Sequence, residues 1–154
     1  MLQRVQSIYL LLAGLAIFAL FLFPLVHSVP VDGKLLTIKV TGVFQEVNGQ
    51  LAHTQFFVAL TAATVVVGLI PLIIIFLYKN RKQQIGLCYS AILVIIGYSF
   101  WMAQTVKSVG SIEIDTHNWG IGLLLSSVSI VFIIAAFKGI QSDEKLVKSA
   151  DRLR

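Results

Sequence analysis

Four long windows of the chain contain no charged residue, and every Asp, Glu, Lys and Arg lies between or beyond them. The windows run from Val5 to Val31, from Val47 to Tyr78, from Gln83 to Val106 and from Thr116 to Phe137. Each is long enough for the ~20 apolar residues with which a helix crosses ~30 Å of hydrocarbon. Because a soluble domain of this size lacks the polar surface to cover four such helices, the pattern predicts a multi-pass membrane protein.

The predicted fold is an all-α membrane protein, an antiparallel bundle of four transmembrane helices that forms a single domain over residues 1–154. With 57% hydrophobic and 12% charged residues, the chain has little material for a second, soluble domain. We expect spans near 5–27, 54–78, 84–106 and 118–138, outer loops at 28–53 and 107–117, and a tail at 139–154. The first window could also be a signal peptide, but it exceeds the usual apolar stretch of about 7–15 residues, so we expect it to be retained.

Basic residues predict the orientation of this bundle. Nine of the 12 lie at the chain ends or in the second connection: Arg4, Lys79, Arg81, Lys82, Lys138, Lys145, Lys148, Arg152 and Arg154. The other two connections hold only Lys34, Lys39 and Lys107. By the positive-inside rule, both termini and the Lys79–Lys82 turn are cytoplasmic. The net charge of +5 therefore reports orientation, and we expect no nucleic-acid partner.

Aromatic side chains gather near both predicted membrane boundaries, where amphipathic rings prefer the headgroup level. Those near the inner boundary are Tyr9, Tyr78, Tyr89 and Phe137. Those near the outer boundary are Phe56, Phe57, Trp101 and Trp119. The two groups agree with the orientation that the basic residues predict.

Small and polar residues within the windows predict how the helices pack. Ala59 with Ala63, and Gly122 with Ser126, have the small-xxx-small spacing that lets helix backbones approach closely. Pro71 lacks a backbone donor and predicts a kink in the second helix. We expect three serines of the fourth helix to bond to carbonyls of their own or a neighbouring helix: Ser126, Ser127 and Ser129.

The first outer connection predicts strands of a small extracytoplasmic sheet. Its apolar residues alternate with polar ones at Leu36, Ile38 and Val40. Asp32-Gly33 and Asn48-Gly49 are strong turn signals on either side, Gly42 indicates a bulge or bend, and 43–47 continues as a second strand. Residues 111–115 of the third connection also alternate. Because three strands are more stable than an isolated hairpin, we expect one antiparallel sheet from the first and third loops.

Candidate site residues are few. The three histidines all lie on the predicted outer side: His27, His53 and His117. With Asp32, Glu113 and Asp115 nearby, a metal site or a pH-responsive cluster can be drawn, but no ligand spacing is diagnostic. Cys88 is the single cysteine, which excludes an intramolecular disulfide and a Cys-based zinc site. We therefore expect no catalytic residue, metal or cofactor.

The tail after Phe137 predicts a separate, short cytoplasmic helix. Ser142 is a good N-cap, and Asp143 and Glu144 suit a first turn. Apolar residues recur at helical spacing at Leu146, Val147, Ala150 and Leu153. A helix of ~12 residues is marginal alone, so it needs anionic lipid, its own bundle or a partner protein as a surface.

Both ends of the chain resemble a known family. The opening is Met-Leu-Gln-Arg-Val-Gln-Ser-Ile-Tyr-Leu-Leu-Leu-Ala, and the ending is Asp-Glu-Lys-Leu-Val-Lys-Ser-Ala-Asp-Arg-Leu-Arg. They are similar to the ends of small four-helix inner-membrane proteins of Bacteroidota, the domain of unknown function 4293. The resemblance implies four spans in a bacterial inner membrane, and it brings no assigned activity or catalytic residue. The polar residues at both ends of such proteins lead us to expect both ends on the cytoplasmic side, where Arg4 and Asp151 contact each other or a shared partner.

The functional expectation is a non-catalytic auxiliary or scaffolding subunit of a membrane protein assembly, with the lipid bilayer and a membrane protein or a second copy as partners. The alternative is a small-molecule transporter or channel acting as a homo-oligomer. Transporters usually carry ionisable groups or broken helices at mid-membrane, whereas these windows are uncharged. A membrane enzyme is the third and least expected function, because no acid–base pair, nucleophile–base pair or set of metal ligands lies at one depth in the membrane.

Overall fold

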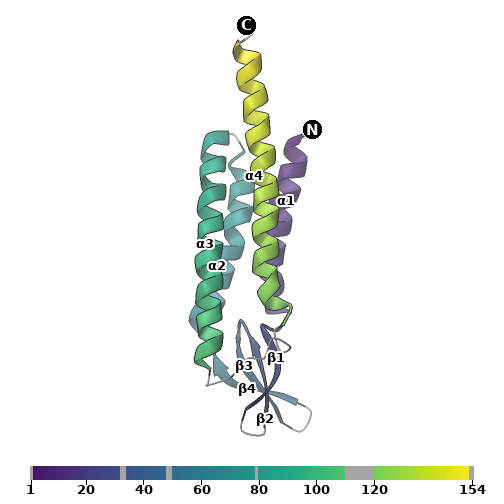
Figure 1. The fold of residues 1–154 in the computed structure, drawn as a ribbon, viewed down its shortest axis with the longest axis vertical. Helices are drawn as coiled ribbons and strands as arrows, with labels where there is room; N and C mark the ends of the chain where they lie inside the picture. Colours follow the sequence, from purple (N-terminus) through teal and green to yellow (C-terminus); the bar gives the residue numbers. More distant parts are fainter. Residues whose placement is uncertain (1, 32–33, 48–49, 79, 110–119, 153–154) are drawn as a thin grey trace.

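The computed structural model describes residues 2–31, 34–47, 50–78, 80–109 and 120–152. Four long helices lie side by side, and a small antiparallel sheet lies beyond one of their ends (Figure 1). The helices are α1 (Leu2–Phe18), the short 3₁₀ helix η1 (Ala19–Phe21), α2 (Val58–Phe76), α3 (Arg81–Ser108) and α4 (Gly122–Arg152). The strands are β1 (Val26–Val31), β2 (Lys34–Lys39), β3 (Gly42–Val47) and β4 (Gln50–Phe56).

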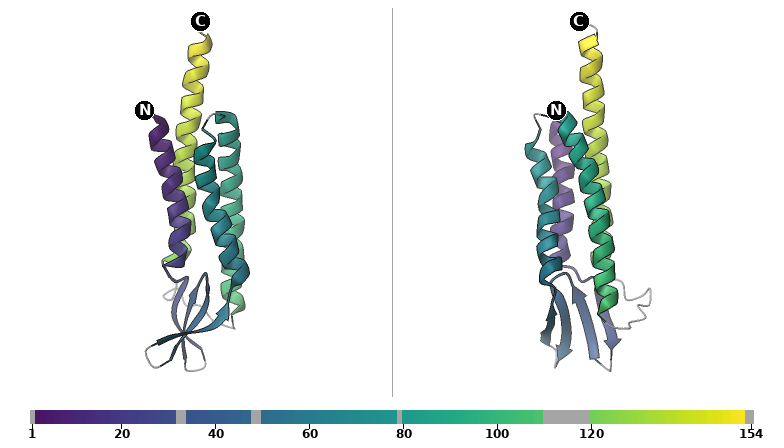
Figure 2. Two further views of the ribbon diagram at one scale, coloured as in Figure 1. Left: turned by 180° about the vertical axis from the view of Figure 1, so that it is seen from behind. Right: turned by 90° about the vertical axis from the view of Figure 1, so that its left-hand side faces the viewer.

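Different parts of the chain lie at the two ends of the helical layer. Both chain ends and the α2–α3 connection lie at one end, here called the terminal end, and the sheet lies at the other, the sheet end (Figure 2). α1 packs against α2 and α4, and α3 packs against the same two helices. Among the described residues, three helices are long and apolar enough to cross a membrane: α2, α3 and residues 122–147 of α4. The apolar stretch of α1 and η1, Val5–Phe21, is shorter.

The first helix ends earlier than the predicted span of 5–27. α1 stops at Phe18, tightens into η1, and gives way to β1 at Val26. Pro24 explains the break, because proline disfavours a helical conformation in the residue before it and cannot donate a helix hydrogen bond. The β-branched residues that follow favour a strand. The charge-free window therefore contains a helix and a strand.

The sheet is a four-stranded meander in the order β1-β2-β3-β4, and all four described strands come from the first connection. β2 and β3 confirm the two strands predicted there, whereas β1 and β4 were not predicted. β4 takes in residues 54–56, which were assigned to the second span, and Val43 pairs with Gln55 there. The turn signals at 32–33 and 48–49 and the strand predicted at 111–115 lie outside the described residues.

Gly42 starts β3 directly after the Val40-Thr41 turn and has a positive φ of 153°. A Cβ at this position would lie 2.0 Å from the carbonyl oxygen of Gln55 and 2.6 Å from Cε1 of His53. The register between β3 and β4 shifts at Val43 and Phe44, directly after the glycine. The predicted bulge at Gly42 is confirmed, and glycine is needed there both for its conformation and for space.

The sheet and the helices share one core. Leu20, Leu25, Ile38 and Val40 are fully buried within the same apolar cluster as the helix interior. The backbone of Leu25 donates to the carbonyl of Ile38 at 2.8 Å and accepts from the N–H of Gly120 at 2.8 Å. These bonds tie β2, the α1–β1 connection and the start of α4 together.

The fourth helix continues to Arg152 without a break. The predicted separate tail helix and its N-cap at Ser142 are therefore wrong, because Ser142 lies inside α4. The segment after Phe137 contains no proline, and Gly139 alone does not stop a helix that is packed on a neighbour. A Cβ at Gly139 would lie 3.0 Å from Cγ of Gln6, so the glycine lets α1 approach α4 closely.

Two glycines that the spacing analysis did not single out lie where α1 and α2 approach each other closely. A Cβ on Gly14 would lie 3.2 Å from the carbonyl oxygen of Gly68, and a Cβ on Gly68 would lie 3.0 Å from the ring of Phe18. Ala59, predicted to lie in such a contact, is exposed. Gly122 instead meets the connection between η1 and β1, where its N–H donates to the carbonyl of Pro24 at 3.1 Å.

Candidate functional site

The two described histidines do not lie close together. His27 is in β1 and His53 is in β4, and two strands lie between them. Three strand spacings separate them by about 14 Å, which is too far for a shared metal ion. His117 lies outside the described residues. Within the described ranges, no group of three or more His, Cys, Asp or Glu side chains could hold a metal ion.

His53 instead packs as an aromatic ring. It stacks on Phe56 with ring centroids 3.8 Å apart and meets Phe44 edge-on at 4.3 Å. The ammonium of Lys39 lies 5.5 Å from the centre of the Phe44 ring. Nδ1 of His53 is buried without a hydrogen-bond partner among the described residues. This small aromatic group stiffens the base of the sheet where β4 leads into α2.

Polar side chains inside the helical layer are used for packing. The hydroxyl of Thr64 donates to the carbonyl of Leu60 at 2.7 Å, so Tyr98 must donate in its 2.7 Å bond to Thr64. Thr64 and Tyr98 are both buried, on α2 and α3. The sequence analysis missed this pair, although two hydroxyls within facing apolar windows were the available signal.

Two more buried polar side chains bond to carbonyls of neighbouring helices. Ser129 on α4 donates to the carbonyl of Ala13 on α1 at 2.9 Å, and Gln84 on α3 donates to the carbonyl of Ile74 at 3.2 Å. Ile74 lies in the last turn of α2, and its carbonyl also accepts from the N–H of Leu77 at 3.2 Å. The predicted role of Ser129 is confirmed, and Ser126 bonds back to Leu123 as predicted.

A polar contact joins three helices at the terminal end. The amide nitrogen of Gln6 donates to Oδ2 of Asp143 at 2.7 Å, which links α1 to α4. Arg81, in the first turn of α3, donates to the backbone carbonyl of Asp143 at 3.3 Å. Gln6 is only 7% exposed, so its bond compensates the burial of its amide. The side chains of Arg4 and Asp151 lie outside the described part, and their expected contact stays a prediction.

The end of α4 extends beyond the other helices. Figure 1 shows its last turns standing clear of the terminal end. From Asp143, which still contacts Gln6, to Arg152 the helix rises by about 14 Å at 1.5 Å per residue. Leu146 is 59% exposed and Val147 is 47% exposed on this projecting segment, residues 144–152. It is an ordered helix with apolar side chains that no described element covers, which makes it the candidate interaction surface.

Comparison with known proteins places the chain in a family. No curated protein matches it. The family model of the domain of unknown function DUF4293 matches residues 2–153, which is nearly the whole chain. This confirms the resemblance that both ends of the sequence suggested. The protein therefore belongs to the DUF4293 family.

Proposed function

We propose that this chain is a multi-pass protein of the bacterial inner membrane whose four long helices all cross the bilayer as an antiparallel bundle. Both termini and the α2–α3 connection are cytoplasmic, and the sheet is extracytoplasmic. The 17 residues of α1 and the three of η1 together span about 31 Å, which matches ~30 Å of hydrocarbon. The nine basic residues at the chain ends and in the second connection of the sequence support this orientation.

The function that this arrangement supports best is that of a non-catalytic subunit that docks a partner protein in a membrane assembly. The projecting segment of α4 is the observation that carries the proposal. No described element covers this end of α4, so exposed Leu146 and Val147 gain free energy when a partner covers them. The partner is another protein of the same membrane or its cytoplasmic face, with an apolar groove for an amphipathic helix.

The interior polar groups favour this proposal over transport. A transport path needs polar side chains that face a solute, often near unwound helices. Here Thr64 and Tyr98 bond to each other, and Ser129 and Gln84 bond to helix carbonyls. These bonds hold the helices together and leave the described polar groups of the interior occupied.

Site-specific photo-crosslinking in native membranes tests the proposal. A photoreactive phenylalanine analogue replaces Leu146, or Leu93 in the matched control. Leu93 is 70% exposed on α3, at a depth where we expect lipid. We expect the variant at Leu146 to give one discrete protein adduct, in an amount comparable to the chain itself, whereas the variant at Leu93 reacts with lipid.

Mass spectrometry of the adduct identifies the partner. The same partner should co-purify with the unmodified chain in mild detergent and be lost when residues 144–154 are removed. Lipid adducts alone at both positions would contradict the docking role. A clean homo-oligomer enclosing a polar pore would instead favour the transporter reading.

A further inference from the structure

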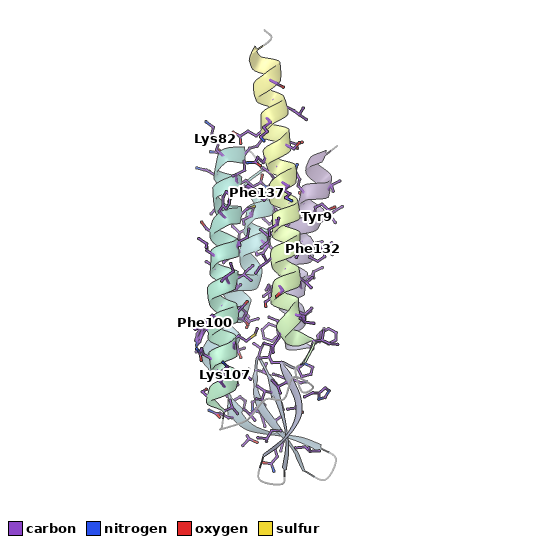
Figure 3. All side chains as sticks on the ribbon, in the orientation of Figure 1. Tyr9, Lys82, Phe100, Lys107, Phe132 and Phe137 are labelled. Atoms are coloured by element: carbon purple, nitrogen blue, oxygen red, sulfur yellow. The ribbon has the colours of Figure 1, made fainter. Side chains whose placement is uncertain are left out.

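The surface where α3 and α4 meet carries an aromatic pair near the terminal end. The rings of Tyr89 on α3 and Phe137 on α4 have centroids 4.6 Å apart and planes tilted by 59°. Tyr89 is 55% exposed, so the pair opens onto the surface of the molecule. Figure 3 shows Phe137 in the part of α4 toward the terminal end, and Lys82 at the end of α3 beyond it. Rings at this level are typical of the membrane–water boundary.

Lysines on both helices lie nearer to the terminal end than this aromatic pair. α3 and α4 run in opposite directions, so going back from Tyr89 to Lys82 and forward from Phe137 to Lys145 both lead toward the terminal end. At 1.5 Å per residue, Lys82 and Lys145 lie about 10–12 Å beyond the rings. Lys138 follows Phe137 and shares a helix face with Lys145, two turns further on. All three lysines are exposed.

Basic side chains outnumber acidic ones at this surface. The carboxylate of Asp143 bonds to Gln6 on the α1 side of α4, while its backbone carbonyl accepts from Arg81 on the α3 side. The guanidinium of Arg81 therefore adds a fourth positive charge next to the lysines. Glu144 is the remaining acid on this turn, so four basic side chains stand against two carboxylates. We call this surface, formed by Arg81, Lys82, Tyr89, Phe137, Lys138 and Lys145, the α3–α4 basic seam.

We infer that the α3–α4 basic seam binds the phosphodiester headgroup of an anionic phospholipid. Long lysine side chains lay their stems along the apolar surface and hold their ammonium groups at headgroup level. Basic groups from two neighbouring helices suit a phosphodiester, and the aromatic pair offers a surface to the upper acyl chains. The inference rests on the proposed placement in the membrane, and it assigns the lipid to the cytoplasmic leaflet. It uses a different face of α4 from Leu146.

Native mass spectrometry of the purified full-length protein tests the seam. Phosphatidylglycerol and phosphatidylcholine are titrated separately into the same detergent. The seam variant is K82Q/K138Q/K145Q, and the matched control is K34Q/K39Q/K107Q, which removes the same charge at the sheet end. Each lysine is expected to contribute about fivefold to the affinity for an anionic lipid. We therefore expect the seam variant to lose at least tenfold in its affinity for phosphatidylglycerol and to bind both lipids alike. The control keeps the selectivity of the natural chain.

Three outcomes would overturn the inference: retained selectivity in the seam variant, an equal loss in the control, or displacement of the lipid by glycerol phosphate at equal concentration, which would make the ligand a soluble phosphate. The variant K82R/K138R/K145R preserves charge and should retain selectivity. If the triple Gln variant unfolds, the single variants K82Q and K138Q decide, each with a loss of about fivefold expected.

Membrane insertion is measured for the same variants, before solubilisation, by the resistance of each chain to alkaline carbonate extraction from native membranes. A chain that resists extraction but shows no lipid selectivity overturns the lipid site alone. A chain that is extracted overturns the membrane placement, and with it the proposed function.

Discussion

At the scale of single residues, buried hydroxyls and glycines determine how closely the helices pack. The Tyr98 hydroxyl lies between α2 and α3, where its bond to Thr64 replaces the water that it would bind when exposed. The Thr64 oxygen can accept this bond because the Thr64 hydroxyl donates its own proton to the carbonyl of Leu60 within α2. Such a pair costs little while both members are present and much more when one is left alone.

We predict that Thr64→Val destabilises the protein by about 1–2 kcal/mol, because the shape is kept while the Tyr98 hydroxyl loses its acceptor. Tyr98→Phe in the same chain should recover much of the loss, since neither hydroxyl is then buried unpaired. Unfolding of the four members of this double-mutant cycle, measured in mixed micelles, gives the coupling. Thr105→Val is the control, because that exposed hydroxyl bonds only within α3. Additive effects of the two changes would contradict the bond.

The glycines of α1 and α3 are expected to respond oppositely to a larger side chain. Gly14→Leu should destabilise the protein by roughly 2–4 kcal/mol, because its side chain would meet Leu72 and the backbone of Gly68 at about 3 Å. Gly97→Leu should be neutral or stabilising, since no described atom outside its own helix lies within 4 Å and leucine favours a helix. Thermal unfolding of both variants in one detergent measures the difference. Equal losses would show that Gly14 is not a contact position.

At the scale of elements, the ends of α1 and α4 are held together through Gln6 and Asp143. The carboxylate makes this a charge-assisted bond, and Gly139 leaves the space for the Gln6 side chain. Because Arg81 binds the same turn of α4, the start of α3 is attached to it as well. The projecting segment of α4 therefore begins from a turn that two other helices hold.

We predict a coupling of about 1–2 kcal/mol between Gln6 and Asp143 in a double-mutant cycle with alanine at both positions. Hydrogen exchange supplies a second readout: each single variant should raise amide exchange in residues 138–147 of α4. Ser142→Ala changes a neighbouring exposed residue and should leave the exchange unchanged. If both single variants exchange like the natural chain, the contact does not hold α4.

At the scale of the whole molecule, the two ends of the helical layer differ in charge and in structure. The sheet is joined to the helices through the shared core at Leu25 and Ile38, so it is fixed relative to them. The opposite end carries the chain termini, the basic seam and the projecting segment. In the proposed orientation, the sheet faces the outside and every proposed interaction surface faces the cytoplasm.

Cysteine labelling checks this orientation. In a Cys88→Ala background, Gln55→Cys places a thiol on exposed β4, and Ser142→Cys places one on exposed α4. We predict that a membrane-impermeant maleimide labels the first variant in intact spheroplasts and the second only after lysis. Labelling in the reverse pattern would invert the topology, and labelling of both before lysis would exclude a membrane-spanning arrangement with these ends on opposite sides.

The sequence was most informative where one physical effect dominates. Charge-free windows predicted apolar helices, and period-two alternation predicted β2 and β3, because burial imposes both patterns directly. β1 and β4 escaped prediction because they lie inside charge-free windows, where a strand and the end of a helix have the same composition. The contact of Gln6 with Asp143 joins residues 137 positions apart, and no local pattern encodes such a pairing.

By itself, the sequence determined the long apolar helices and the separation of basic and uncharged segments, because these depend on composition along the chain. It determined the family through the order of residues at both ends. Only the tertiary structure decided where the first helix ends, that the tail continues α4, and which glycines allow helices to meet. It also separated His27 from His53 and brought Arg81, Lys82 and Lys138 to one surface. These outcomes depend on how distant segments pack, and the free energy of that packing is a property of the pairs and not of either segment alone.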